Sequence, residues 1–232
     1  MGGWWVHSLY EQGRTVELVS WIFWVLLSIT LHELAHGWAA LWQGDDTPKR
    51  LNRMSLNPIV HMGMTAMIVF ALAGIAWGVM PVTPSRFRWG RRGRIFVSAA
   101  GPAMNLVLAI ITIAMLALLI RFGPASGNLA HNLAVFLFTG AWLNLLLAIF
   151  NLLPVPPLDG SSILSGLSIR AYTWFQNPQA AMFGLVVVFV IFFMSPIGDL
   201  LIDGCQRAVV VSTGLLSGPP PQTPVPPLLQ GG

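Results

Sequence analysis

Long apolar runs separated by short polar loops dominate the pattern along this chain. A helix needs roughly 20 apolar residues to span a bilayer, and we expect four spanning helices: residues 16–43, 95–120, 132–153 and 181–201. A fifth apolar run, residues 62–79, is borderline in length and contains Gly63, Gly74 and Gly78. Residues 161–179 are mixed in character, and we expect a short interfacial helix there. The pattern predicts an all-α polytopic membrane protein.

The composition agrees with this class. The chain is 55% hydrophobic and 9% charged, with a mean hydropathy of +0.72, which is too apolar for an ordinary soluble domain. Its net charge of +4 comes mostly from loop arginines, which is typical of membrane topology rather than of nucleic-acid binding. Cys205 is the only cysteine, so an internal disulfide and a cysteine-based zinc site are both excluded.

One membrane-embedded domain accounts for most of the sequence. We expect it to cover residues 1–215, with a catalytic core at about residues 18–165. The remaining residues, 216–232, are rich in proline and are expected to form a disordered tail.

Charged and metal-ligating residues interrupt the first apolar run. His32 and His36 lie four apart and so share one face of a helix, with Glu33 at the edge of that face. Two imidazoles at this spacing can bind one zinc ion, and the intervening glutamate can act as general base toward water. The alternative is two packed histidines and a glutamate that reaches the surface. Because such residues are costly inside a membrane, we favour the metal site.

A third protein ligand is expected for catalytic zinc, and Asp159 is the best candidate. It follows a predicted spanning helix, lies after three prolines and precedes Gly160, so a rigid turn could direct its carboxylate into the bundle. A simple Asp-Gly turn is the alternative. The other acidic residues precede the first helix or lie at helix ends.

The directions of the helices decide whether Asp159 can reach the histidines. Both lie toward the C-terminal ends of their helices, so these helices must run parallel. This holds if residues 62–79 enter and leave the membrane on one side, which also puts the basic loops 49–53 and 86–94 on one face. We therefore predict that residues 62–79 form a re-entrant segment that lines the metal site. The site would lie nearer the cytoplasmic face of a prokaryotic cell membrane.

Five short segments together form a recognisable set: residues 32–36 (HELAH), 57–61 (NPIVH), 81–84 (PVTP), 101–105 (GPAMN) and 151–160 (NLLPVPPLDG). The set resembles the site-2 protease family of intramembrane zinc metalloproteases, in its short prokaryotic branch without a PDZ domain. The resemblance covers roughly residues 18–165 and is specific, whereas HExxH alone is not.

The resemblance implies a zinc endopeptidase that cleaves membrane-spanning or peptide substrates within the lipid bilayer, with one Zn²⁺ per chain. His32, His36 and Asp159 would be the zinc ligands and Glu33 the general base. Asn151 resembles the family's asparagine that binds substrate or oxyanion.

Two further polar residues are weaker candidates for contact with substrate or oxyanion. Asn105 resembles a packing element of the neighbouring core helix. His61 is either a loop histidine or a polar contact at the mouth of the site.

Other functions use the same residues differently. A catalytically idle scaffold that binds partner helices would not need Glu33. A metal or proton transporter could use the His-Glu cluster, but no inverted repeat is evident. A protease with a helix-borne glutamate ligand is excluded, since no glutamate follows Glu33.

Overall fold

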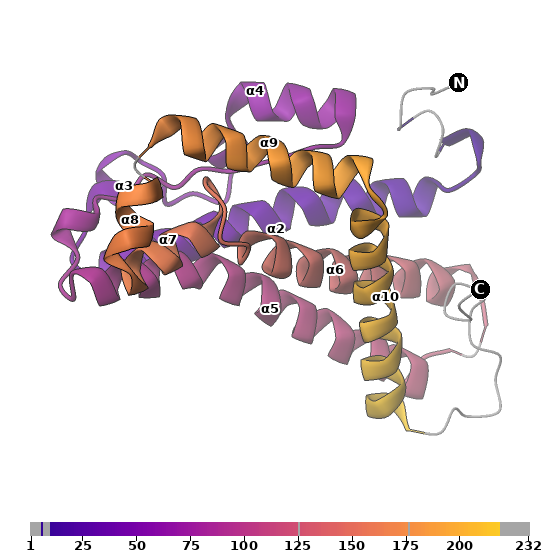
Figure 1. Ribbon diagram of the computed structural model, residues 1–232. Coiled ribbons are helices and arrows are strands. Elements are labelled where there is room, and N and C mark those ends of the chain that lie inside the picture. The colour runs from indigo at the N-terminus through magenta and orange to yellow at the C-terminus, as the bar shows by residue number, and fades with distance from the viewer. Residues whose placement is uncertain (1–5, 7–9, 125, 176, 219–232) are drawn as a thin grey trace.

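Four long apolar helices form the body of the protein. The computed structural model describes residues 6, 10–124, 126–175 and 177–218. The helices long and apolar enough to cross a membrane are α2 (Thr15–Trp42), α5 (Arg91–Phe122), α6 (Asn128–Asn151) and α10 (Pro196–Ser217). In Figure 1, α2, α5 and α6 run alongside one another, and α10 crosses them near one end. The described residues form no strand, so the all-α prediction is confirmed.

The shorter elements cover the ends and one side of this body. They are α3 (Thr47–Arg50), α4 (Pro58–Ala73), η1 (Pro84–Arg86), α7 (Asp159–Leu167), α8 (Ile169–Phe175) and α9 (Pro178–Met194). The interfacial helix expected at residues 161–179 is thus two short helices and the start of a third. Residues 219–232 of the predicted disordered tail lie outside the described residues, whereas Leu216 and Ser217 still belong to α10.

The last predicted span, residues 181–201, is wrong in its bounds. The structure breaks this run at Ser195, between α9 and α10. Pro196 has no N–H and favours an extended conformation in the residue before it, and Ser195 has φ −128° and ψ 162°. Its Oγ accepts a hydrogen bond from the Ile197 N–H at 3.3 Å, so Ser195 caps α10. The fourth long apolar helix is therefore residues 196–217.

The borderline apolar run contains a helix followed by an extended return. Asn57 caps the start of α4 by accepting a hydrogen bond from the Ile59 N–H at 3.0 Å. The helix ends at Gly74, which has φ 73°. The chain then comes back, and the Val79 N–H donates to the His61 carbonyl at 3.0 Å. The segment thus leaves and returns at one place, as a re-entrant path requires; its depth in a bilayer remains a prediction.

Asp45 fixes this return to the end of α2. Its side chain is fully buried and accepts hydrogen bonds from the Thr47 N–H at 3.0 Å, the Thr47 hydroxyl at 2.5 Å and the Thr83 N–H at 2.6 Å. The Arg88 N–H donates to the Gln43 carbonyl at 2.8 Å. Because of these bonds, α5 begins beside the place where α2 ends, and the two helices run in opposite directions.

The α2–α6 contact is close because Gly140 lacks a side chain. A Cβ at this position would overlap the indole of Trp24. The Trp24 Nε1–H donates to the Phe136 carbonyl at 2.8 Å, which satisfies its polar group inside an apolar core. With α2 and α6 both antiparallel to α5, the C-terminal ends of α2 and α6 lie at the same end of the molecule.

Candidate metal centre

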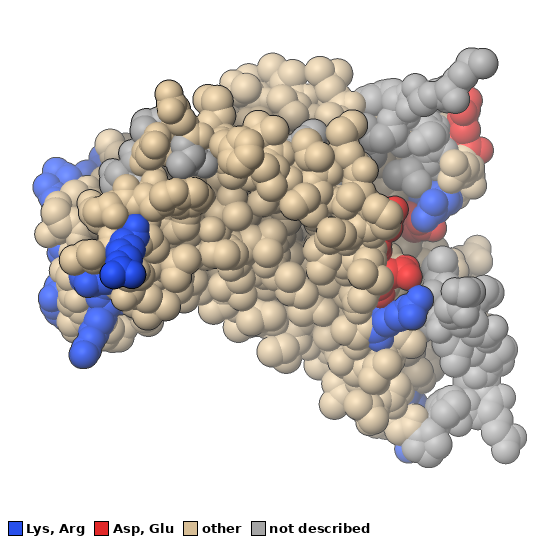
Figure 2. All heavy atoms as spheres, viewed as in Figure 1, with Lys and Arg blue, Asp and Glu red and all other residues tan. Residues whose placement is uncertain are grey.

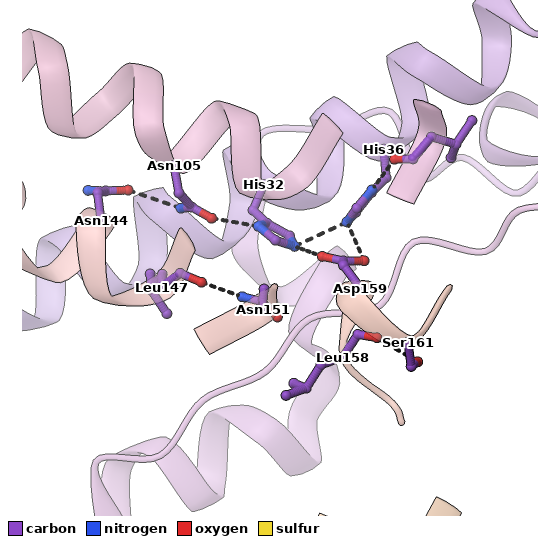
Figure 3. Close-up of polar contacts among 10 residues, drawn as sticks. His32, His36, Asn105, Asn144, Leu147, Asn151, Leu158, Asp159 and Ser161 are labelled. Carbon is purple, nitrogen blue, oxygen red and sulfur yellow. Dashed lines mark hydrogen bonds and ion pairs between the residues drawn. The ribbon is translucent and has the colours of Figure 1, made fainter. Parts of the chain in front are cut away.

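Two imidazoles from one turn of α2 face each other at the centre of the site. His32 and His36 are both buried, and their Nε2 atoms lie 3.1 Å apart. Each Nδ1 has a separate partner on α5: the Asn105 Oδ1 lies 2.6 Å from His32 Nδ1, and the Val97 carbonyl lies 2.7 Å from His36 Nδ1. Figure 3 shows these two contacts, which fix the orientation of each ring.

Asp159 reaches the same point from a distant part of the sequence. It is the first residue of α7, and its carboxylate lies 3.1 Å from His32 Nε2 and 3.3 Å from His36 Nε2. The tight turn requires Gly160, because a Cβ there would overlap the carbonyls of Leu152 and Leu153. Asp159 Oδ2 is buried and has no hydrogen-bond partner among the described residues.

The partners of the rings decide which nitrogens carry protons. The Val97 carbonyl can only accept a hydrogen bond, so His36 Nδ1 carries the hydrogen, and in a neutral ring Nε2 is then a bare lone pair. The Asn105 oxygen has the same effect on His32. Figure 3 shows the two Nε2 atoms and the Asp159 carboxylate converging on one point. With both rings neutral, two imidazole lone pairs and a carboxylate meet there with no hydrogen between them. Such an arrangement repels itself unless a cation lies among the three.

The donor set and its spacing suit zinc. One ligand atom from each residue lies within 4.8 Å of the other two. The two Nε2 atoms are 3.1 Å apart, and Asp159 approaches His32 with Oδ2 at 3.1 Å and His36 with Oδ1 at 3.3 Å. A tetrahedral zinc ion with bonds of about 2.0–2.1 Å keeps its ligands about 3.3 Å apart. Three protein ligands leave a fourth position, as in catalytic zinc sites.

Gly101 keeps the space in front of the rings open. A Cβ at this position of α5 would lie against His36 Nε2 and 2.5 Å from His32 Nε2. Pro102, the next residue, is buried inside the helix and removes one backbone donor there. Gly101 thus lets α5 pass directly beside the two imidazoles.

Glu33 lies beside the histidines and under the returning segment. It is 6% exposed, and no other described residue donates a hydrogen bond to its carboxylate. A Cβ on Gly78 would lie 2.7 Å from both the Cγ and the Oε1 of Glu33. Only glycine lets the backbone of residue 78 approach this carboxylate so closely.

The other predicted site residues differ in their surroundings. The Asn151 Nδ2 donates to the Leu147 carbonyl at 3.0 Å on the last turn of α6. His61 is 2% exposed and its Nε2 lies 2.6 Å from the Ser55 carbonyl. Its Nδ1 is buried and has no hydrogen-bond partner within the described part of the chain. Asn105 is fully buried and contacts His32 rather than open space.

Two participants were missed by the sequence analysis. Asn144 accepts a hydrogen bond from Asn105 and donates one to the Gly140 carbonyl. A polar amide within an apolar span could have indicated its buried role. The Val97 carbonyl carries no signal in the sequence, because every residue has one.

Basic side chains gather at the end of the molecule where α2 finishes and α5 begins, as the blue end of Figure 2 shows. This end contains nine of the 12 lysines and arginines: Lys49, Arg50, Arg53, Arg86, Arg88, Arg91, Arg92, Arg94 and Arg170. Arg170 belongs to α8. This helix contacts α5 through a cation–π interaction, in which the Arg94 guanidinium carbon lies 5.1 Å from the centre of the Tyr172 ring. At the opposite end three arginines accompany four acidic residues: Arg14, Arg121, Arg207, Glu11, Glu17, Asp199 and Asp203.

Known proteins resemble this chain over most of its length. The family model described as "Peptidase family M50" matches residues 120–195. The "Putative zinc metalloprotease YwhC" of Bacillus subtilis is 38% identical over 184 residues, which is 77% of this chain and 81% of that protein. The "Putative zinc metalloprotease Rip2" of Mycobacterium tuberculosis is 32% identical over 173 residues, covering 72% of this chain and 64% of the relative.

A more distant relative carries a similar name. The "Zinc metalloprotease MJ0392" of Methanocaldococcus jannaschii is 27% identical over 166 residues, 69% of this chain and 39% of that protein. No solved structure matches the chain. Together with the four apolar helices, these relatives show that the protein is a zinc-dependent metalloprotease of the membrane and belongs to peptidase family M50, the site-2 protease family.

Proposed function

We propose that this protein is an intramembrane endopeptidase that hydrolyses peptide bonds in membrane-spanning substrates, with one Zn²⁺ held by His32, His36 and Asp159. The observation that supports this most strongly is the convergence of two imidazole Nε2 atoms and a carboxylate, while the Nδ1 of each ring faces an oxygen acceptor. The fourth position of such a zinc site is free for water or substrate.

Glu33 is proposed as the general base. Zinc, when bound, lowers the pKa of a water toward about 7 and polarises a nearby carbonyl. Glu33 takes the proton of the attacking water and delivers it to the leaving amine nitrogen. Its carboxylate suits this role because it lies next to His32 in the sequence and, among the described residues, accepts no hydrogen bond that would occupy it.

Asn151 and His61 are proposed to contact the substrate. An amide nitrogen has two hydrogens, and Asn151 donates one to Leu147, so the other can stabilise the oxyanion of the attacked carbonyl. His61 must donate from Nε2 to the Ser55 carbonyl, which leaves Nδ1 as a buried acceptor without a partner. A substrate N–H could satisfy it.

The substrate must be unwound before it is cut. A helix hides its carbonyls in internal hydrogen bonds, and a bilayer offers no water to replace them. The extended return after α4 passes Gly78 over Glu33, so we propose that residues 62–79 form a re-entrant wall of the site. An unwound substrate segment would lie against this wall.

The charge distribution supports a cytoplasmic position for the site. Nine of the 12 basic residues lie at the end of the molecule next to the metal ligands, and basic loops prefer the cytoplasmic side. His36 is seven residues from the end of α2 at Gln43, or about 10 Å at 1.5 Å per residue. The reaction would therefore take place within a prokaryotic cell membrane, below its cytoplasmic surface.

The decisive experiment separates zinc binding from cleavage. Full-length protein is reconstituted in vesicles with fluorogenic membrane-spanning peptides, and bound zinc is measured on the same samples. Glu33→Gln is expected to keep zinc and to lose about 10²–10⁴-fold in cleavage rate, the usual contribution of acid–base catalysis. Asp159→Ala is expected to lose both. Glu17→Gln, at the far end of α2, is the matched control and should change neither.

Two outcomes would contradict the proposal. Wild-type cleavage by Glu33→Gln would exclude Glu33 as the base. A wild-type protein that binds no zinc and cuts no peptide, yet retains the peptides in pull-down, would be a scaffold instead.

A further inference from the structure

Two buried amides connect the metal centre to the backbone of α6. Behind His32, the Asn105 Nδ2 donates to the Asn144 Oδ1 at 3.0 Å, and the Asn144 Nδ2 donates to the Gly140 carbonyl at 2.8 Å. Both asparagines have 0% exposed surface. Figure 3 shows Asn144, Asn105 and His32 in one line that leads to Asp159. We call these two residues the amide chain.

The amide chain has only one consistent direction. A backbone carbonyl cannot donate a hydrogen bond, so the Asn144 amide nitrogen must face Gly140 and its oxygen must face Asn105. The Asn105 nitrogen then faces Asn144, which leaves the Asn105 oxygen facing His32. His32 Nδ1 must therefore carry the hydrogen, and Nε2 is left as a lone pair.

We propose that Asn105 and Asn144 are positioning residues, which hold His32 in the tautomer whose Nε2 can bind the metal. This inference rests on the proposed zinc site, and it assigns to Asn105 an orienting role in place of the substrate contact expected from the sequence. The carbonyl of Gly140 sets the direction of the whole chain.

The two histidines depend on different kinds of support. His36 donates to a backbone carbonyl, that of Val97, which side-chain substitution leaves in place. His32 depends on side chains alone. Two uncharged polar groups buried between apolar helices carry a desolvation cost unless both are satisfied, and here their bonds connect the Gly140 carbonyl to the metal ligand.

A purely structural role would join α5 to α6 without affecting the imidazole. The structural role and the positioning role predict different effects of substituting the two asparagines. If the amides only join helices, their loss lowers stability and leaves zinc affinity and tautomer unaltered. If they orient His32, zinc affinity falls while the fold persists.

The test measures zinc affinity by chelator competition, and the His32 tautomer by ¹⁵N NMR, on full-length protein in vesicles. The metal-free wild type is expected to show hydrogen on Nδ1 of His32, with His32→Gln used to assign the signal. Asn105→Leu should mix the tautomers and weaken zinc binding by about 10–100-fold, as loss of a partner behind a metal ligand does.

Two variants keep the test decisive. Asn105→Asp is close in shape: one carboxyl oxygen still accepts from His32, and the other, once protonated, donates to the Asn144 oxygen. Tautomer and zinc affinity should therefore be restored. Asn144→Leu leaves Asn105 in place but frees its amide to turn, and a loss of about tenfold in zinc affinity is expected. It also replaces Asn105→Leu if that variant does not fold.

Thr112→Val is the matched control. Thr112 is equally buried, lies two turns along α5 and bonds only to backbone carbonyls of its own helix. It should leave zinc binding and the tautomer unchanged.

The results distinguish this inference from the proposed function. If the wild type binds zinc and both leucine variants bind it equally well, the amide chain does not position His32. Hydrogen on Nε2 of His32 in the metal-free wild type would overturn the inference as well. If the wild type shows the expected tautomer but binds no zinc, the proposed function fails and the role of the amide chain stands.

Discussion

Single atoms decide whether the three ligands can meet. At Gly101 the missing Cβ leaves room for the Nε2 atoms of His32 and His36. Gly78 does the same for the Glu33 carboxylate. Neither of these glycines has a positive φ. Their requirement comes from tertiary contact alone.

Gly101→Ala is expected to damage the metal centre selectively. The new methyl group would press on both ligand nitrogens, and overpacking of this kind costs about 1–3 kcal/mol. If that cost falls on the bound state, zinc affinity drops by about 5- to 150-fold. Chelator competition measures the loss.

Gly204→Ala and Gly214→Ala are the controls for this variant. A Cβ at either position of α10 meets nothing within 4 Å, so zinc affinity should be unchanged. Unaltered zinc binding by Gly101→Ala would show that the metal does not lie where the ligand atoms converge.

At the scale of elements, the segment between α2 and α5 is held at both ends. Its return is joined to α4 through Val79 and His61, and Asp45 holds Thr83 at the end of α2. Gly78, which crosses Glu33, comes directly before the Val79 anchor, and residues 80–82 link that anchor to Thr83. The conformation of this extended stretch therefore depends on Asp45, which lies more than two turns beyond His36.

Asp45→Ala is expected to loosen this stretch. It leaves the N–H groups of Thr47 and Thr83 and the Thr47 hydroxyl without their acceptor, and each buried donor without a partner costs about 1–3 kcal/mol. Amide hydrogen exchange at residues 75–83 should become faster, and peptide cleavage slower, while zinc content is kept.

Asp46→Ala provides the comparison. The neighbouring carboxylate is exposed and pairs with Arg50 at 3.2 Å and Arg86 at 2.5 Å, and exposed pairs contribute little to stability. Exchange at residues 75–83 should be the same as in the wild type. Equal exchange in Asp45→Ala would mean that Asp45 does not anchor the segment.

For the whole molecule, the two ends differ in charge. The end next to the metal ligands carries nine basic residues, with Asp45 buried and Asp46 paired. At the opposite end, Arg14 pairs with Glu17 and Arg207 with Asp203. A bilayer with an anionic cytoplasmic leaflet favours one insertion of such a molecule.

Thiol labelling can determine the orientation. Cys205 is the only cysteine and is buried, so a Cys205→Ala background accepts single probes. Ser85→Cys lies beside the basic loop and Ser126→Cys between α5 and α6, and both positions are exposed. A membrane-impermeant thiol reagent should label position 126 in intact cells and position 85 only after permeabilisation. The opposite pattern would place the metal centre near the outer face.

Much of this protein could be predicted from local pattern. Apolar runs of spanning length define α2, α5 and α6 to within a few residues, because a helix must satisfy its own backbone in lipid. The spacing of His32 and His36 puts them on one face of α2 by helix geometry alone. Asp159 stands out in the sequence because it follows three prolines and precedes Gly160, and its carboxylate lies beside both histidines.

The tertiary structure decided what depends on contacts between distant residues. The break at Ser195 follows from Pro196, but an apolar run with one proline can be a kinked span or two helices, and packing selects between them. The partners of the two imidazoles come from α5, over 60 residues away along the chain. Hydrophobic periodicity predicts which face of a helix is buried, but it does not predict which atoms of other helices contact that face. The direction of a buried chain of hydrogen bonds therefore follows only from the tertiary structure.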